Sequence, residues 1–579
     1  MSLLAALARA CDRLPNAPPY GFSSEKIGFC IVLNRDGSEA EVIDLRDTDK
    51  KRSPRMLLVP QAVKRTVGIA PNFLWDKSAY VLGVTAGEGK RTADEHAKFR
   101  AQHLDWLAGT KDEGLLALCR FMEGWKPEAF AAPVWSEDLR DQNIVFRLAE
   151  EFDFLHDRPE ARALWRRIGA AAASDPQICL VTGDPGPVAR LHPSIKGVWG
   201  AQSSGASLIS FNLDAFTSYG HEQGDNAPVS EAAAFAYTTA LNRFLEKGSG
   251  HRVQIGDAST VFWADASAED AEAAEDLYLG YFDPLDDDKV AANKIKDKLE
   301  AIRKGAPLRD VLPRLADVPF HVLGLAPNAA RLSVRFYWSG SFGTLTERYQ
   351  RYLADKDVLP PPREGWPPLW RYLAELAVQG KRENVPPLIA GDWMRAILTG
   401  GRYPMTLLAT TLTRIRADGD VNALRAGILK SILIRNFNME APVALDPDFK
   451  ESKGYLLGRL FATYEQVQRA ALGGNVNATI KDKFYGAASA SPQKVFATLN
   501  AGAQNHFTKL RKTNPGWAYN LDELIRSIMN QMSPGDDPIP AFLNAPEQGL
   551  FGLGYYHQRS DFFRKRDDQN EDKEPEITE

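Results

Sequence analysis

The sequence lacks the features that mark most secreted, membrane and disulfide-bonded proteins. Its 579 residues contain only four cysteines, Cys11, Cys30, Cys119 and Cys179, and their wide spacing fits neither a zinc site nor a disulfide framework, so we expect reduced thiols. No uninterrupted apolar run approaches the roughly 20 residues that a membrane helix needs. The apolar start is broken by Arg9, which suits an amphipathic helix better than a signal peptide. We therefore expect a cytoplasmic protein without a membrane partner.

Motifs for metal-dependent or nucleophilic catalysis are also missing. The nine histidines form no HExxH pattern and no Cys/His cluster with ligand spacing. Residues 83–91 carry the Gly-Lys pair of a phosphate-binding loop, but Val84 stands where its first glycine belongs and Arg91 replaces the magnesium-binding hydroxyl. Residues 201–205 resemble a nucleophile elbow, yet a strand is expected after them where that motif requires a helix. The sequence thus predicts a protein that is not an enzyme and holds no metal or cofactor.

An excess of positive charge is missing as well. The chain has 70 Lys and Arg against 75 Asp and Glu, which argues against a protein that coats nucleic acid without specificity. Any such contact should be local or shared with partners. Residues 411–530 differ, because they hold 16 Lys and Arg against 10 Asp and Glu and so predict a modest basic surface. The plainer interpretation of any one of these charges is a solvated helix face. The candidates for contact with a DNA backbone are Arg414, Arg416, Arg425, Lys430, Arg435, Arg459, Lys481, Lys483, Lys509, Arg511 and Lys512.

Hydrophobic patterning predicts an α+β protein, with β-sheet elements in a mixed N-terminal region and helices in the C-terminal part. Asp36-Gly37 between two apolar runs is a strong hairpin signal, because such a turn needs positive φ. After about residue 387 the strand signal fades and helical patterns follow one another, which predicts a bundle whose last long helix includes 521–532. Strands are expected at 27–33, 39–45, 56–59, 79–84, 144–148, 178–182, 208–212, 253–263, 320–325 and 332–338.

A chain of this length exceeds a single core, so several domains are expected. Shifts in composition and pattern divide it into four parts. They are a mixed α+β region at 1–255, an acidic and helical excursion with a second α+β segment at 256–395, a helical bundle at 396–566 and a disordered acidic tail at 567–579.

The run 64–75 combines residue types that suit DNA recognition. Lys64 and Arg65 precede a Gly/Pro turn that presents Asn72 and Phe73. Cations can position a duplex through its phosphates, asparagine can form paired hydrogen bonds with adenine, and an apolar ring can help to part base pairs. The alternative is that Asn72 caps a turn and Phe73 anchors the core, and the residues alone favour that alternative.

The run 202–242 reads as a polar loop, an alternating strand, a turn and a capped helix. Residues 203–205 should leave backbone N–H groups open to an anion or a base edge. Ser230 is expected to cap a helix whose apolar face carries Ala234, Tyr237, Leu241 and Phe244. This order of elements suits a scaffold for contacts better than a catalytic site.

Five runs follow one another along the chain from residue 65 to residue 496. They are RTVGIAPNFLWDKSAYVLG, GVWGAQSSGASLISFN, EQGDNAPVSEAAAFAYTTALNRFL, AILTGGRYPMTLLATTLTRIRAD and YLLGRLFATYEQVQRAAL, the last followed by NATIKDKFYGAASASPQKVF. Each run is a weak motif, but the five in order form a specific resemblance. In sequence and in order they are similar to the large subunit of type I-C CRISPR effector complexes, the RNA-guided DNA surveillance assemblies called Cascade.

The resemblance implies a non-catalytic subunit that reads the protospacer-adjacent motif in duplex DNA and helps to open the duplex for pairing with the guide RNA in antiviral defence. Its implied partners are the crRNA-bound backbone subunits, a small subunit, the target duplex, the displaced strand and a recruited helicase-nuclease. Our hypothesis assigns motif reading and duplex opening to Asn72, Lys64, Arg65 and Phe73, supported by Gln202, Ser203, Ser204 and Asn226.

The resemblance also implies that the C-terminal bundle resembles the Cascade small subunit and can be made separately from the same gene. Met439 is the candidate internal start, and a product of residues 439–579 would hold 141 residues, enough for a small bundle. The alternatives are that Met439 is an ordinary loop residue, or that the start codon encodes Val or Leu.

Two other classes of function stay open at this stage. A metal-dependent nuclease would bring distant carboxylates together in the fold and lose activity on chelation. A structural scaffold would contact proteins only, so substitution of Lys64, Arg65 or Asn72 would leave DNA binding unchanged.

Overall fold

The chain forms two compact units. The computed structural model describes residues 2–14, 17–48, 52–63, 65, 68–171, 176–211, 213–282, 290–473, 478–532 and 537–563. The first unit contains Met1–Lys247 and Pro327–Leu332, and the second contains Gly248–Ala326 and Ser333–Glu579. The division near residue 247 lies close to the boundary expected at 255, whereas the boundary expected at 395 falls inside the second unit.

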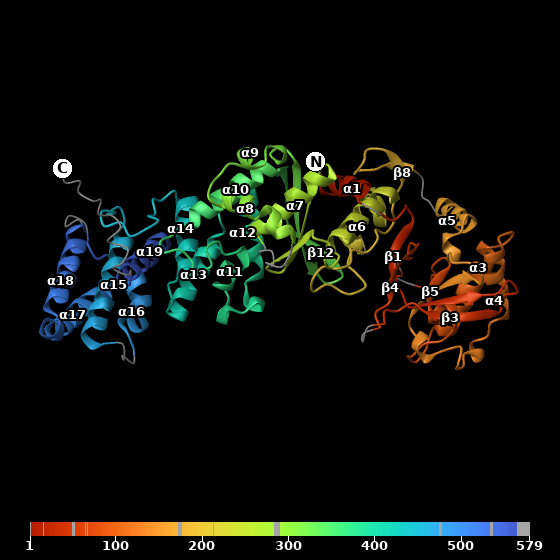
Figure 1. Cartoon of the computed structure of the whole chain (residues 1–579), viewed down its shortest axis with the longest axis horizontal. Helices are drawn as coiled ribbons and strands as arrows, with labels where there is room; N and C mark the ends of the chain where they lie inside the picture. The colour runs from red at the N-terminus through yellow and green to blue at the C-terminus, as the bar shows by residue number, and fades with distance from the viewer. Residues whose placement is uncertain are drawn as a thin grey trace, which may run out of the picture. The chain divides into compact units, whose positions relative to one another are not determined.

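The first unit contains a mixed four-stranded sheet (Figure 1). The hairpin expected around Asp36-Gly37 is present, and Gly37 has a φ of +88°. The strand order is β3 (Glu39–Asp44), β2 (Phe29–Leu33), β6 (Asn143–Leu148) and β5 (Trp75–Lys77), and only the β2–β6 pair is parallel. A separate antiparallel pair joins β1 (Phe22–Ile27) to β4 (Arg55–Pro60). A third pair joins β7 (Pro176–Ile178) to β8 (Pro185–Pro187).

Both faces of β2 are covered, which explains why its five residues are all apolar and buried. Ile31 packs with the larger core of the first unit, beside Leu115 and Phe121. Val32 packs on the other face with Val59. The helices of this region are α2 (Ser78–Val81), α3 (Thr92–Trp106), α4 (Glu113–Gly124) and α5 (Pro159–Ala171).

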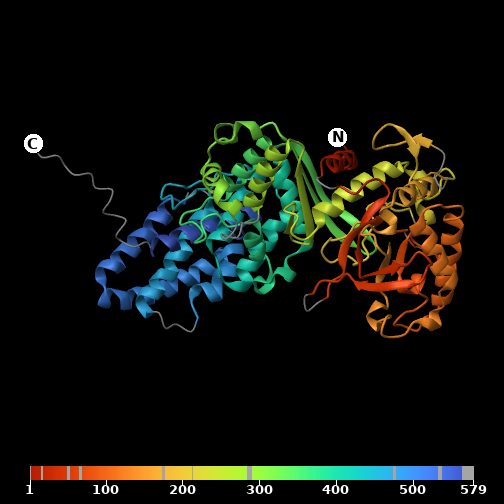
Figure 2. The same ribbon diagram turned by 45° about the vertical axis from the view of Figure 1, so that its right-hand side comes forward.

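Helix α6 (Glu231–Leu245) starts and packs as the sequence predicts. The Ser230 hydroxyl accepts a hydrogen bond from the N–H of Ala233, so Ser230 is the N-cap. The expected apolar face is at most 2% exposed at Ala234, Tyr237, Leu241 and Phe244. The N-terminal helix α1 (Leu3–Arg13) packs against α6 (Figure 2).

The second unit begins with a four-stranded sheet in the order β12 (Arg331–Ser341), β11 (Pro319–Asn328), β10 (Ala258–Ala264) and β9 (Arg252–Ile255). These strands confirm the signals read at 253–263, 320–325 and 332–338. The helix that we expected as part of a surface excursion packs into the core, because Ile302 is fully buried. The helices here are α7 (Ala268–Phe282), α8 (Val290–Arg303), α9 (Leu308–Val311) and α10 (Phe342–Lys356).

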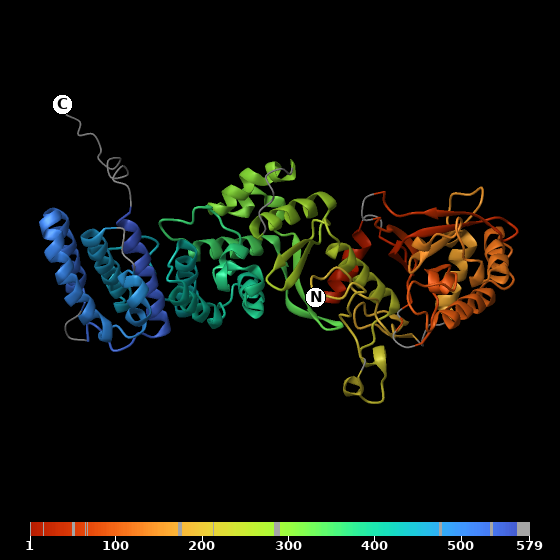
Figure 3. The same cartoon turned by 90° about the horizontal axis from the view of Figure 1, so that it is seen from below.

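The rest of the second unit is helical in all its described elements, which confirms the α+β class with a C-terminal bundle. Figure 3 shows the last helices, drawn in blue, side by side. The helices are α11 (Leu369–Ala374), α12 (Pro387–Thr399), α13 (Met405–Asp418), α14 (Ala423–Phe437), α15 (Lys453–Leu472), α16 (Ile480–Ala490), α17 (Gln493–Thr513), α18 (Pro515–Asn530) and α19 (Ala545–Asp561).

Helix α19 was not predicted from the sequence, in which the last expected helix corresponds to α18. It is nevertheless central, since every residue from Gly549 to Gln558 is buried. Glycines let it approach α15 closely: a Cβ on Gly458 would lie 2.1 Å from the Phe551 carbonyl oxygen, and one on Gly554 would lie 2.2 Å from that of Tyr455. The N–H of Gly454, at the start of α15, donates to Glu547 at the start of α19, and Arg469, near the end of α15, lies over the ring of Phe563 just after α19, so the two helices run parallel.

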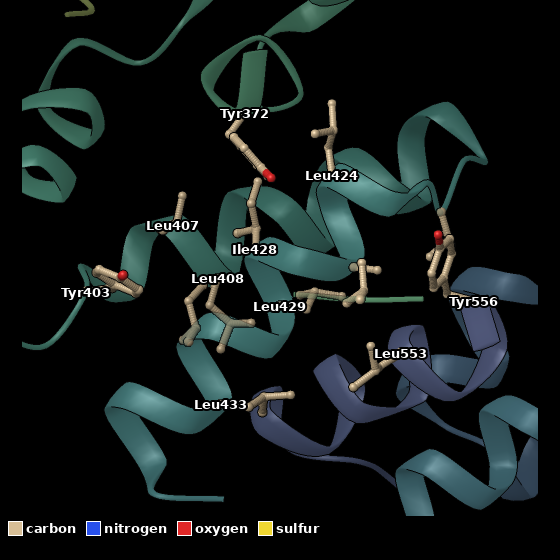
Figure 4. Close-up of a cluster of buried hydrophobic side chains, with 14 of the residues drawn as sticks. Tyr372, Tyr403, Leu407, Leu408, Leu424, Ile428, Leu429, Leu433, Leu553 and Tyr556 are labelled. Carbon is tan, nitrogen blue, oxygen red and sulfur yellow. The ribbon is translucent and has the colours of Figure 1, made fainter. Parts of the chain in front are cut away.

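Side chains of α14 cover another face of α19 (Figure 4). Leu429 and Leu433 reach toward α19, where a Cβ added to Gly552 would lie 2.9 Å from Leu429. Leu553 and Tyr556 of α19 belong to the same buried cluster. The helices after α14 therefore share their core with the helices before it.

Several local expectations were wrong. Residues 79–84 were expected as a strand but contain the short helix α2, since a short apolar run does not distinguish the two by periodicity. Residues 208–211 form no strand, and their neighbours Ala206 and Ser207 make only isolated bridges. Among the helices that the structure describes, none has the length and apolar character needed to span a bilayer.

Candidate nucleic-acid interface

The first candidate site is the 61–74 loop, defined as the residues between β4 and β5. Its base is closed by Asn72, which is only 4% exposed. The N–H of Val63 donates to Asn72 Oδ1 at 2.9 Å, and the N–H of Asn72 donates to Asp76 Oδ2 at 2.9 Å. Asn72 therefore has the turn-capping role that the residues alone favoured. Because its Oδ1 is occupied, the paired hydrogen bonds to adenine are not available to Asn72 in this conformation.

Arg65 is turned back into the same loop. Its Nε donates to the Ala70 carbonyl oxygen at 2.7 Å, and its guanidinium pairs with Asp76 and lies 4.1 Å from the centre of the Tyr80 ring. Asp76 is 1% exposed. Burial raises the pKa of Asp76, while the Arg65 guanidinium and the N–H groups of Asn72 and Lys77 act in the opposite direction. Arg65 and Asp76 thus fix the shape of the loop.

Phe73 anchors the loop in the core. Its ring is fully buried and stacks on Trp165 with centroids 5.4 Å apart. In this conformation the ring is not available to part base pairs. Leu74 follows with a φ of +62°, and its N–H donates to His103 Nε2 at 2.9 Å.

His103, on α3, is a fixed acceptor for the loop. Its Nδ1 donates to the Phe99 carbonyl oxygen at 2.8 Å, so the ring is neutral with Nε2 free to accept from Leu74. The side chain is fully buried, and burial lowers the pKa of His103 to about 4. The neutral ring holds Leu74 in its unusual backbone conformation.

The tip of the 61–74 loop faces solvent where it is described. Lys64 lies outside the described residues. Gly68 is exposed with a φ of +90°, and no atom lies within 4 Å of the position that a Cβ would occupy there. The described part of the loop is therefore fixed at its base and exposed at Arg65 and Gly68.

The second candidate site is the 195–206 loop. Ile195 and Ala206 close it by exchanging two backbone hydrogen bonds of 2.9 Å each. Gln202, Ser203 and Ser204 are exposed at the tip, as the sequence predicts. The N–H of Gly205 is not open to a ligand, because it donates to the Gln202 carbonyl oxygen at 2.9 Å.

Asn226 organises a neighbouring turn. Its Oδ1 accepts from the N–H of Ser218 at 2.9 Å, and its Nδ2 donates to the carbonyl oxygens of His221 (3.2 Å) and Gln223 (3.0 Å). The amide group therefore has a structural role in this conformation, and a role in motif reading stays a prediction.

Several of the cations chosen as candidates for phosphate contact are used inside the second unit. Arg459 is 2% exposed, and it donates to Gln558 Oε1 at 3.2 Å and to the Pro447 carbonyl oxygen at 3.1 Å. Burial lowers the pKa of Arg459. Arg414 pairs with Asp418 on its own helix, α13. The buried residues Arg425, Lys430 and Arg435 on α14 are likewise held by internal partners. Because the side chain of Arg459 is enclosed in this conformation, its contact with a phosphate stays a prediction.

The other candidates form a basic surface on α16 and α17, two helices that pack together. We define the α16–α17 surface as Lys481, Lys483, Lys509, Arg511 and Lys512. Lys481 is half-buried and the other four are exposed, and none has an ion-pair partner among the described residues. The sequence analysis missed Lys494, which is exposed on α17. Arg416 lies apart, on α13, where it donates to Gln548.

A comparison with known protein families gives a match over nearly the whole chain. The family described as "CRISPR-associated protein (Cas_Csd1)" matches residues 4–563. The chain belongs to this CRISPR-associated family. Both candidate loops and the α16–α17 surface lie within the matched residues of this Csd1-family protein. No curated protein matches the sequence.

Met439 lies between α14 and α15. Its N–H donates to the Leu433 carbonyl oxygen at 3.1 Å, just after Asn438, which has a φ of +51°. The side chain is half-buried against the core. Met439 therefore completes the end of α14, and a second role as an internal start stays a prediction.

The described part of this Csd1-family protein contains no group of three or more His, Cys, Asp or Glu side chains placed to hold a metal ion. Sequence reasoning also missed groups that support the loops, above all Asp76 and His103 beneath the 61–74 loop. Asp76 follows the run 64–75 directly, so its proximity was a usable signal. Nothing in the sequence indicated a role for His103, since only the fold brings α3 beneath the loop.

Proposed function

We propose that this Csd1-family protein is the non-catalytic large subunit of a type I-C CRISPR effector complex. In this proposal it recognises the protospacer-adjacent motif in duplex DNA and aids duplex opening and R-loop formation. Its partners are the crRNA-bound backbone subunits, a small subunit from the same gene, the target duplex, the displaced strand and a recruited helicase-nuclease. The observation that carries the proposal is the 61–74 loop, which is fixed at its base, exposed at Arg65 and Gly68 and within the family match.

In this proposal the 61–74 loop reads DNA, and the contacts of Arg65, Asn72 and Asp76 fix the base from which it does so. A loop that is ordered before binding loses less conformational entropy on binding, which favours recognition of a short motif. Among the described residues, Asn72 Nδ2 has no hydrogen-bond partner. Asn72 could therefore contribute a single donor to a base acceptor once the loop meets DNA.

The displaced strand would follow the α16–α17 surface. Its cations come from two neighbouring helices and lack carboxylate partners among the described residues, so phosphates would not have to displace an internal ion pair. Contact would be dominated by electrostatics and would weaken with salt.

A test uses the assembled complex with matched crRNA and two duplexes that differ only in the base pairs beside the protospacer. Asn72→Ala should lose discrimination between the duplexes while still joining the complex. Asn72→Asp separates reading from positioning, because it keeps an acceptor for the Val63 N–H and removes the Nδ2 donor. Loss of discrimination in both variants supports reading by Asn72, whereas loss in Asn72→Ala alone supports positioning. Asn520→Ala, at an exposed site on α18, is the control.

Other outcomes of this experiment would contradict the proposal. A wild-type complex that binds both duplexes equally would favour a scaffold that contacts proteins only. Cleavage of DNA by the isolated chain, abolished by chelation, would favour a nuclease.

The separate small subunit has its own test. We propose that translation from Met439 yields residues 439–579, which include α15 to α19. A C-terminal tag should then report two bands, and Met439→Ile should remove the shorter one. A full-length band alone from the wild-type gene would exclude an internal product from any start codon.

A further inference from the structure

Strand β1 lies between the bases of the two candidate loops. It pairs with β4, from whose end the 61–74 loop begins. Ser23 and Glu25 are two residues apart on β1, so their side chains lie on the same face of the strand. The N–H of Ala62 donates to Ser23 Oγ at 3.4 Å, and Ser23 Oγ donates to Glu25 Oε1 at 3.2 Å. Glu25 is thus connected to the base of the first loop.

The same carboxylate holds the second loop. Lys196 Nζ donates to Glu25 Oε2 at 2.8 Å and to Oε1 at 3.0 Å. The backbone of Lys196 is fixed independently, because its N–H donates to Asn242 Oδ1 at 2.7 Å on α6. Asn242 Nδ2 also donates to the Ser194 carbonyl oxygen at 3.2 Å. A chain of hydrogen bonds therefore runs from Ala62 to Lys196.

This link differs from an ordinary surface ion pair. The Glu25 side chain is only 14% exposed, and both of its oxygens accept from Lys196. The partners are separated by 171 residues in sequence, so the link fixes the distance between two loops and not the shape of one. Exposed pairs contribute little to stability, but a pair at the bases of two loops controls how the loops are placed.

We infer that the described 68–71 turn of the first loop and the 195–206 loop form one composite recognition surface for duplex DNA, held together by Ser23, Glu25 and Lys196. This inference rests on the proposed function. One loop offers a fixed Gly/Pro turn, and the other offers the exposed polar side chains of Gln202, Ser203 and Ser204. A duplex that contacts both loops meets donors at a set separation, so Glu25 and Lys196 are positioning residues for recognition.

Hydrogen exchange of the free full-length chain tests the link without DNA. Glu25→Gln keeps the size of the side chain and an acceptor for Ser23 but loses the charge that holds Lys196. It should raise exchange at the Lys196 and Ala206 N–H groups by between about twofold and fivefold, the range of a partly exposed ion pair. Glu246→Gln, which breaks the exposed Arg243 pair on α6, is the matched control. Equal exchange in both variants would overturn the link.

Binding to the two duplexes by the assembled complex tests the composite surface. In the wild-type background, the losses of discrimination caused by Asn72→Ala and Gln202→Ala should be non-additive, since both loops contact one duplex. In the Glu25→Gln background, the two effects should become independent, and Lys196→Met should behave like Glu25→Gln. Independent effects in the wild-type background would overturn the composite surface. A wild-type complex without discrimination would instead overturn the proposed function, and the exchange result would still decide the link.

Discussion

At the scale of the residue, the buried groups beneath the 61–74 loop determine which contacts Asn72 and Arg65 can make. Asn72 and Arg65 looked like direct DNA contacts because amide and guanidinium groups are common in base and phosphate recognition. The fold commits much of their hydrogen-bonding capacity to Val63, Ala70 and Asp76. Asn72 and Arg65 then contribute to specificity by fixing the base of the loop.

Removing either partner of the Arg65–Asp76 pair should have unequal effects. Arg65→Met leaves Asp76, which is 1% exposed, as a buried carboxylate without its cation. Asp76→Asn leaves a guanidinium that is 26% exposed and can turn to water. We expect Arg65→Met to lower the free energy of unfolding by roughly 2–4 kcal/mol and Asp76→Asn by roughly half as much. Denaturant titration of the first unit's transition measures both, and a larger effect of Asp76→Asn would contradict the argument.

His103 should make the first unit sensitive to acid. Its pKa is about 4 in the fold and 6.5 in the unfolded chain, so the unfolded state binds more protons between these values. The contribution to stability is complete above pH 6.5 and falls by about 1.4 kcal/mol per pH unit as the pH drops toward 4.

Unfolding of His103→Gln at pH 7 and pH 5 checks this expectation. The variant should be less stable than the wild type at pH 7, because it disturbs the contacts with Leu74 and Phe99, but its stability should change less with pH. Burial also lowers the pKa of His557 to about 4, in the second unit. The second unit's acid sensitivity should therefore persist in the variant, and an unchanged pH slope in the first unit would rule out His103 as its source.

At the scale of the element, glycine sets the contact between α15 and α19. Gly458→Ala would place a methyl group 2.1 Å from the Phe551 carbonyl oxygen, and a backbone atom cannot yield as a side chain can. We expect the melting temperature of the second unit to fall, with a loss of stability of about 2 kcal/mol or more. Gly502→Ala on α17 is the control, since no atom lies within 4 Å of its added Cβ. It should stabilise the helix by up to about 1 kcal/mol.

The α16–α17 surface should determine the salt dependence of single-strand binding. Changing Lys509, Arg511 and Lys512 to Gln should reduce the slope of log affinity against log salt by up to roughly 0.7 for each phosphate that is no longer neutralised. Arg414→Gln is the control, because Arg414 already pairs with Asp418. Affinities measured across a salt series test this, and equal slopes for the triple variant and the control would remove the α16–α17 surface from the proposed path of the strand.

At the scale of the whole molecule, the sequence predicted what local rules determine. The Asp36-Gly37 hairpin, the Ser230 cap and the helical bundle follow from turn chemistry, capping and periodicity, and each was confirmed. Helix α19 was not predicted, because its three glycines weaken the helical pattern in the sequence. In the fold, these glycines allow neighbouring helices to pack closely. The Glu25–Lys196 pair could not be predicted from the sequence, since no local sequence pattern indicates a contact between residues 171 positions apart.

For the candidate site, the sequence predicted which loop residues are exposed better than it predicted what the side chains contact. The exposed tip at Gln202, Ser203 and Ser204 lies where the polar Gly/Ser pattern indicated. The residues alone favoured a buried position for Phe73, which is confirmed, but the burial of Arg459 could not be predicted from residue type, because most guanidinium groups lie at the surface. In the fold, Phe73 stacks on Trp165 and Arg459 donates to Gln558.

The parallel packing of α15 on α19 has a consequence for synthesis. The glycine-lined side of α15 is translated about ninety residues before its partner (Gly454 to Glu547), and no helix made between them replaces that packing. The nascent bundle therefore leaves an apolar side of α15 open until α19 has been translated. A chain that ends before residue 545 would contain the other described helices of the second unit but would lack the helix that covers the glycine-lined side of α15.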